Sequence, residues 1–178
     1  PPDKPMTHQP LNVLFLCTGN SARSQMAEAL INTMGQGRFR AYSAGSHPTG
    51  KVNPFAVEKV ESVNYPTENL RSKSWEEFAH SNARKMDLII TVCDQAAGET
   101  CPTWPGHPVT VHWSIPDPAI ATGTSEQIQN AFSTALKMLQ HRISLLLARP
   151  LETLDRVAAK SCIEQLGQTP EPSAHPLP

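Results

Sequence analysis

The chain has 178 residues, of which 39% are hydrophobic and 17% charged, and its formal net charge is −1. This mixture is typical of a soluble globular protein, and the near-neutral charge argues against a basic nucleic-acid-binding protein. No apolar stretch approaches the roughly 20 residues of a membrane span. We therefore expect one domain with no nucleic-acid partner and no membrane partner.

The first half of the chain predicts two strand–helix units and then a short helix. Leu11–Cys17 is nearly all apolar, as in a strand that is buried on both faces. Good helix formers fill Ser24–Met34, and Arg40–Ala44 is typical of a short strand. Pro54–Val63 predicts a helix with proline in its first turn, and Ser74–Phe78 predicts a shorter helix.

The second half predicts two further strands and two helices. The apolar run Met86–Cys93 predicts a second buried strand, and Val109–Trp113 predicts another that ends before a Pro-Asp-Pro turn. Ser125–Arg149 has an apolar stripe at helical spacing, which predicts a long amphipathic helix. A last helix is expected to start at Pro150 and to run to about Leu166, with Gly167 as its cap.

Alternating strands and helices predict an α/β fold. We expect a single domain with a four-stranded parallel sheet, helices on both faces and an extra C-terminal helix. Prolines concentrate near both ends of the chain, where they favour extended, poorly ordered segments. The expected segments are a disordered or tag-like tail (1–10), the main domain (11–149), a C-terminal helical extension (150–167) and a proline-rich tail (168–178).

The clearest functional signal lies between the first strand and the first helix, in the octet Cys17-Thr18-Gly19-Asn20-Ser21-Ala22-Arg23-Ser24. A strand-to-helix loop of small residues turns successive backbone N–H groups inward and makes a cradle for a tetrahedral oxyanion. Gly19 and Asn20 tolerate the positive φ that such a loop needs, and Arg23 can hold two oxyanion oxygens. The octet therefore predicts an oxyanion-binding loop formed by residues 18–24.

The same loop predicts a reactive cysteine. The helix N-terminus and Arg23 are expected to lower the pKa of Cys17, and Ser24 can donate a hydrogen bond to its thiolate. The alternative is that Cys17 merely ends a strand as a small hydrophobe. The complete octet favours the nucleophile.

The four cysteines of the chain are too few for a disulfide framework, and without a secretory signal a reducing cytoplasm is expected. Cys93 and Cys101 frame a segment of small and polar residues, whose expected mobility suits thiol–disulfide exchange. A zinc site that includes His107 and His112 and a chance pair of structural cysteines are the alternatives. Cys162 is expected to be a structural or surface thiol.

Asp117 lies between two prolines just after the last predicted strand. Ligands of parallel sheets bind outside the carboxyl ends of the strands, so Cys17, Cys93 and Asp117 are expected to meet there. The prolines restrict the backbone and can aim the Asp117 carboxyl group into the mouth of the loop, where it would act as a general acid. The alternative is an ordinary turn aspartate.

The octet resembles the Cys-x5-Arg-[Ser/Thr] loop of the low-molecular-weight protein tyrosine phosphatase fold, and CTGNSARSQMAE is similar to the loop of the arsenate reductases built on that fold. The stretch TVCDQAAGETCPTWPGHPVTVHWSIPDPA resembles their redox segment, and the resemblance spans about Leu11 to Arg149. Phosphatases of this fold carry aromatic residues after the matching Asp-Pro, where this chain has Ala119-Ile120-Ala121. The difference favours a small inorganic oxyanion over an aryl phosphate.

The resemblance implies thiol-dependent reduction of arsenate to arsenite, with phosphate or sulfate as competing oxyanions. Cys17 would form an adduct with arsenate while Asp117 protonates the departing oxygen; Cys93 would then attack Cys17, and Cys101 would attack Cys93. No bound cofactor or metal is expected. An external thiol donor, thioredoxin or else glutaredoxin, would reduce the final disulfide, and the protein would be a cytoplasmic monomer.

Two other functions stay open at this point. The first is a phosphatase that hydrolyses phosphomonoesters through a Cys17 phosphoenzyme, with Arg23 and Asp117 in the same roles. The second is an oxyanion-binding or redox-sensing module without turnover.

The resemblance also bears on potassium. In potassium-binding arsenate reductases, residues matching Asn20, Glu28 and Ser43 help to hold the ion together with an aspartate. Lys73 falls where that aspartate would be, and its ammonium group can take the place of the ion. We therefore expect no requirement for potassium. The alternative is that Glu28 is a surface helix residue and Ser43 a strand-end hydroxyl.

Overall fold

The structure, a computed structural model of the chain, describes residues 10–93, 98 and 102–168. The strands pair in parallel in the order β2-β1-β3-β4, with bounds β1 Leu11–Cys17, β2 Phe39–Gly45, β3 Leu88–Thr91 and β4 Val109–His112. This arrangement confirms the predicted α/β fold with a four-stranded parallel sheet. β3 is shorter than the predicted Met86–Cys93 because only Leu88–Thr91 is in register with both β1 and β4.

The α-helices of the described residues are α1 (Arg23–Met34), α2 (Pro54–Ser62), α4 (Ser125–Leu147) and α5 (Arg156–Leu166). Short 3-10 helices span Thr67–Asn69, Trp75–Phe78, Pro118–Ile120 and Leu151–Thr153.

Two predicted helices differ from the structure. The predicted helix Ser74–Phe78 is a single 3-10 turn rather than an α-helix. The last helix begins at Arg156 and not at Pro150, because the Asp155 side chain accepts a hydrogen bond from Ala158 N at 2.8 Å and so caps the helix there. Pro150 instead precedes a separate 3-10 turn.

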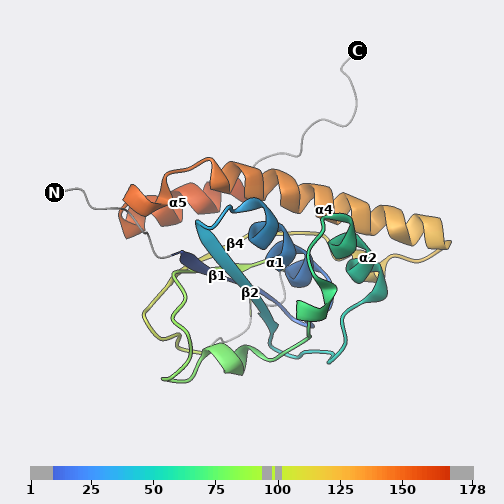
Figure 1. Cartoon of the computed structure of the whole chain (residues 1–178), viewed down its shortest axis with the longest axis horizontal. Coiled ribbons are helices and arrows are strands. Elements are labelled where there is room, and N and C mark those ends of the chain that lie inside the picture. The colour runs from blue at the N-terminus through green and yellow to red at the C-terminus, as the bar shows by residue number, and fades with distance from the viewer. Residues whose placement is uncertain (1–9, 94–97, 99–101, 169–178) are drawn as a thin grey trace, which may run out of the picture.

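Different elements cover the two faces of the sheet. Val13 and Phe15 of β1 lie in a buried cluster with side chains of all these α-helices. Leu14 and Leu16 point the other way, into a second cluster with Trp75, Phe78, Met86 and Trp104. Figure 1 shows α4 along one side of the sheet and the 3-10 helix Trp75–Phe78 on the opposite side. The second face therefore carries a 3-10 helix and loops in place of the α-helix that the sequence predicts.

Helix α5 is part of the main core. Ile163 and Leu166 are buried with the helix-covered face of the sheet, and Trp113 Nε1 donates to Ile163 O at 3.0 Å. Gly167 follows with φ −68°, and a Cβ there would lie 2.6 Å from Trp113 Cδ1. Glycine is thus required at this position because Trp113 lies so close, and not because the backbone is left-handed. Segment 150–167 packs against the sheet rather than extending from it.

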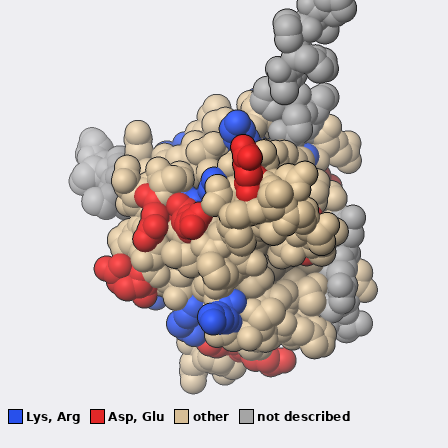
Figure 2. Space-filling view, turned by 90° about the vertical axis from the view of Figure 1, so that its right-hand side faces the viewer, with Lys and Arg blue, Asp and Glu red and all other residues tan. Residues whose placement is uncertain are grey.

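Charged side chains are dispersed over the surface. Figure 2 shows basic and acidic residues interspersed on one face, some of them side by side, in keeping with the net charge of −1. Within the described ranges, no helix is both long and apolar enough to cross a membrane.

Candidate active site

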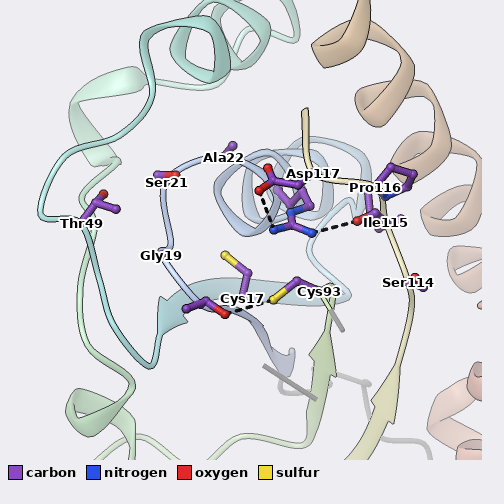
Figure 3. A pocket seen from close by; sticks show the side chains of 12 residues that line it. Cys17, Gly19, Ser21, Ala22, Thr49, Cys93, Ser114, Ile115, Pro116 and Asp117 are labelled. Atoms are coloured by element: carbon purple, nitrogen blue, oxygen red, sulfur yellow. Dashed lines mark hydrogen bonds and ion pairs between the residues drawn. The ribbon is translucent and has the colours of Figure 1, made fainter. Parts of the chain in front are cut away.

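The carboxyl end of the sheet carries a cavity of about 600 Å³ between the loop Cys17–Ser24 and the segment Ser114–Asp117. Predicted site residues from three strand ends line it: Cys17, Arg23, Cys93 and Asp117. Figure 3 shows the side chains of Cys17, Cys93 and Asp117 around one space, with Thr49 on the opposite wall. Cys101 lies outside the described residues.

The loop presents its N–H groups to this cavity because its carbonyl groups are held from outside. Each carbonyl accepts a hydrogen bond: Thr18 from His47 N (2.9 Å), Gly19 from Thr49 N (3.0 Å), Asn20 from the Gln25 side chain (2.9 Å) and Ser21 from Asn53 N (2.8 Å). The carbonyl and the N–H of one peptide group point in opposite directions. Outward carbonyls at residues 18–21 therefore aim the N–H groups of residues 19–22 inward, as an oxyanion cradle requires.

Backbone geometry explains the small residues of the loop. Of the two residues expected to tolerate a positive φ, Asn20 adopts one, at 50°, and Gly19 does not. Gly19 is small for another reason, because a Cβ there would lie 3.2 Å from Thr49 Cγ2. Beneath the loop, a Cβ on Gly45 would lie 2.4 Å from Thr18 O, so only glycine allows this close approach.

The Cys17 sulfur is buried at the base of the cradle. It lies 3.0 Å from Ser24 Oγ and 3.2 Å from Asn20 N. Asn20 Nδ2 donates to Ser24 Oγ at 2.7 Å, which orients the Ser24 hydroxyl so that its own proton faces the sulfur. The loop thus supplies two directed donors to a Cys17 thiolate.

The pKa of Cys17 does not move in the direction that the sequence predicts. Burial raises it above its ordinary value, and the neighbouring Cys93 raises it further, while the hydrogen bonds from Ser24 and Asn20 lower it. The predicted lowering is therefore wrong as a net effect. The donors act in the expected direction, but removal of the thiol from water outweighs them.

Arg23 joins the loop to the segment that carries Asp117. Its Nη1 donates to Ile115 O at 2.9 Å, and its Nη2 lies 3.4 Å from Asp117 Oδ2. The other Asp117 oxygen accepts from Ala119 N at 2.9 Å and caps the 3-10 helix Pro118–Ile120. The carboxylate is thereby kept at the mouth of the cavity, as the flanking prolines suggest.

Cys93 is the second cysteine that lines the cavity. It is buried, and its Sγ lies 3.5 Å from Thr18 Oγ1. Cys162 is half-buried on α5, in a different hollow. His112 Nδ1 lies 2.7 Å from Thr91 Oγ1. Among the residues that the structure describes, no three His, Cys, Asp or Glu side chains gather as a metal site would need.

A buried ion pair lies behind the loop. Lys73 Nζ is 4.0 Å from Glu28 Oε1 and 3.5 Å from Ser43 Oγ, and Ser43 donates to Glu28 at 2.7 Å. Lys73 N also donates to Asn20 Oδ1 at 2.9 Å. Burial raises the pKa of Glu28 and lowers that of Lys73, and each group opposes the shift of the other. The alternative of a surface Glu28 is wrong, since only 6% of the residue is exposed.

The residues that support the loop from outside were not predicted from the sequence. His47, Thr49 and Asn53 supply backbone donors from the segment after β2, and Gln25 and Ser72 add side-chain donors. The segment after β2 starts at the same edge of the sheet as Cys17, because Cys17 pairs with Gly45. Because parallel sheets bind ligands at this edge, the sequence could have placed the segment after β2 near the site, but not its hydrogen bonds to the loop.

Comparisons with known proteins agree with this geometry. The model of the low molecular weight phosphotyrosine protein phosphatase family matches residues 12–160. An arsenate reductase of Bacillus subtilis is 40% identical over 115 residues, which are 65% of this chain and 79% of that protein. An arsenate reductase of Oceanobacillus iheyensis is 34% identical over 133 residues, covering 75% of this chain and 92% of that protein.

Solved structures give the same picture. A structure of an arsenate reductase in the phosphate binding state superposes with a TM-score of 0.62 at 28% identity, covering 78% of this chain and 97% of that chain.

Proposed function

The chain belongs to the low molecular weight phosphotyrosine protein phosphatase family, and we propose that within it the second cavity thiol, Cys93, makes the protein an arsenate reductase rather than a phosphatase. The relatives at 34% and 40% identity are arsenate reductases, which agrees with the activity predicted from the sequence. The protein accordingly reduces arsenate to arsenite.

One observation carries this assignment: Cys17 and Cys93 are buried cysteines that line one cavity together with the oxyanion-binding loop. Hydrolysis of a phosphate ester through a cysteine needs one nucleophile and then water. A second thiol beside the first is useful when the adduct must be resolved by sulfur, which leaves a disulfide and transfers two electrons.

In the first step, the inward N–H groups of the loop and the Arg23 side chain hold the arsenate oxygens. The Cys17 thiolate forms a bond to arsenic, and the departing oxygen leaves as water after it takes a proton from Asp117. Ser24 and Asn20 stabilise the thiolate before the attack, against the opposing effect of burial. The product is a Cys17–arsenate adduct that still holds As(V).

In the second step, the Cys93 thiolate attacks Cys17 Sγ. The electron pair of the sulfur–arsenic bond stays on arsenic, so arsenite leaves as As(III) and a Cys17–Cys93 disulfide remains. Cys101 then attacks Cys93 and releases the Cys17 thiolate. A thioredoxin-type dithiol reduces the Cys93–Cys101 disulfide and becomes oxidised in its place. No bound metal or organic cofactor takes part in this scheme.

The test is arsenate-dependent oxidation of NADPH in the presence of thioredoxin and thioredoxin reductase. Turnover should be lost in Cys93→Ser and in Cys101→Ser and retained in Cys162→Ser, the matched control. Turnover by Cys93→Ser would contradict the relay. If the wild type turns over only after glutathione and glutaredoxin replace thioredoxin, the donor class is wrong but the reductase assignment stands.

Phosphatase activity separates the alternative function. The cradle, Arg23 and Asp117 also suit a phosphate ester, so slow hydrolysis of p-nitrophenyl phosphate is expected. Cys93→Ser should keep this hydrolysis while it loses arsenate reduction. A wild type that hydrolyses the ester and reduces no arsenate with either donor would move the assignment to a phosphatase.

A further inference from the structure

The segment that carries Asp117 is held from behind by a buried arginine that the mechanism above does not use. Arg142 lies on the inner side of α4 and only 6% of the residue is exposed. Its Nη1 donates to Ser114 O at 2.9 Å. This hydrogen bond joins the buried guanidinium to a residue that lines the active-site cavity.

The Ser114–Ile115 peptide group is fixed at both ends. Its carbonyl accepts from Arg142, and its N–H, which belongs to Ile115, donates to Val92 O at 3.2 Å. The next peptide group has no N–H because residue 116 is proline. Its carbonyl, Ile115 O, accepts from Arg23 at 2.9 Å. Two guanidinium groups therefore hold the two successive carbonyls that lead to Asp117.

The prolines transmit this orientation. Pro116 and Pro118 fix their own φ angles and restrict the residues before them, Ile115 and Asp117. Once the Ser114–Ile115 peptide plane is set, few backbone rotations remain before the Asp117 carboxylate. A rotation of that plane would therefore displace the carboxylate.

We propose that Arg142 is a positioning residue for the general acid: its hydrogen bond to Ser114 O sets the backbone that aims Asp117 into the oxyanion cavity. Arg142 touches neither the substrate nor the acid, since Asp117 contacts Arg23 instead. The inference rests on the proposed function in one respect, that Asp117 is the acid.

The first test is a double-mutant cycle on arsenate reduction. Arg142→Met alone should lower kcat by about tenfold to a hundredfold, because a misplaced acid loses much of the roughly 10²–10⁴-fold that general acid catalysis contributes. In an Asp117→Asn background the same substitution should cost less than about threefold, since residues that act as a unit are not additive. Equal losses in both backgrounds would overturn the proposal.

Aryl phosphates give a second readout that general damage would not produce. A leaving group of low pKa departs without an acid, so Arg142→Met should hydrolyse p-nitrophenyl phosphate nearly as well as the wild type and phenyl phosphate much worse. Arg142→Lys, which keeps one donor, should recover part of the phenyl phosphate activity. Lys137→Met removes an exposed cation from the same helix and should change neither rate. Equal losses on both esters would overturn the proposal.

Two measurements separate this inference from the proposed function and from misfolding. Phosphate should protect Cys17 from alkylation equally in the wild type and in Arg142→Met, because the cradle is untouched. If the wild type catalyses neither reaction, the proposed function has failed, and a crystal structure of Arg142→Met then decides the inference. An Asp117 carboxylate in its original place would overturn the proposal.

Discussion

Replacing Ser24 by alanine is expected to raise the pKa of the Cys17 thiol by about one to two pKa units. A hydrogen bond to a charged group contributes about 1.5–3 kcal/mol, and one pKa unit corresponds to about 1.4 kcal/mol. The Ser24 hydroxyl lies 3.0 Å from the sulfur and is fully buried, so water does not replace it readily. Asn20 N, 3.2 Å from the sulfur, remains as the other donor, and therefore the effect is bounded.

The assay is the rate of alkylation by iodoacetamide as a function of pH, in a variant where serine replaces Cys93, Cys101 and Cys162. Only the thiolate reacts, so the midpoint of the rate reports the pKa of Cys17. It should move to higher pH in Ser24→Ala and stay in place in Ser21→Ala, which removes a hydroxyl from the same loop. An unchanged midpoint in Ser24→Ala would refute the view that this hydrogen bond opposes the effect of burial.

Further substitutions at Lys73, Arg23 and Gly167 test the contacts around the site and under α5. Lys73→Met should lower the free energy of unfolding by about 3–5 kcal/mol in urea titrations, because it leaves the Glu28 carboxylate buried without its cation. The second substitution Glu28→Gln should restore part of this loss. If Lys73→Met alone keeps the stability of the wild type, the ion pair does not stabilise the fold. Arg23→Lys should weaken the protection of Cys17 from alkylation by phosphate about tenfold or more, since a lysine cannot hold two oxygens in a fork. Equal protection in the variant and the wild type would show that Arg23 does not bind the oxyanion. Gly167→Ala should cost about 1–3 kcal/mol of stability, because its Cβ would lie 2.6 Å from Trp113 Cδ1; an unchanged melting temperature would mean that α5 shifts freely.

The fold could be predicted where a local pattern decides it. Leu11–Cys17 is apolar at both its ends and forms β1 with those same bounds. The predicted start of α5 was wrong because Pro150 and Asp155 can both mark the beginning of a helix. The packing of α5 against the end of β4 favours the start after Asp155. The sequence predicted a helix at Ser74–Phe78 but not its restriction to one 3-10 turn, since Ser74 is also held by a bridge to Gly45 of β2, far away in the sequence.

The chemistry of the site divides in the same way. The octet contains the proposed nucleophile, the guanidinium and the hydroxyl donor, since all three are local. The sign of the pKa change at Cys17 was wrong because the sequence reveals donors but not how much water the fold excludes. The place of Lys73 beside Glu28 was predictable only through the resemblance to arsenate reductases; no pattern of spacing joins these residues.

The register of the sheet explains why short signals spread along the chain assemble into one site. Cys17 pairs with Gly45, and the residue before it, Leu16, pairs with Thr91, which in turn pairs with His112. The four strands thus end within one residue of one another. At this edge of the sheet β1 contributes the proposed nucleophile, and the segment after β2 holds the carbonyls of the loop. The segment after β3 supplies Cys93, and the segment after β4 carries Asp117. Since a parallel register can shift only as a whole strand, the relative heights of these groups are set by the core. The loops determine only the final orientation of each group, and this is the step at which Arg142 acts.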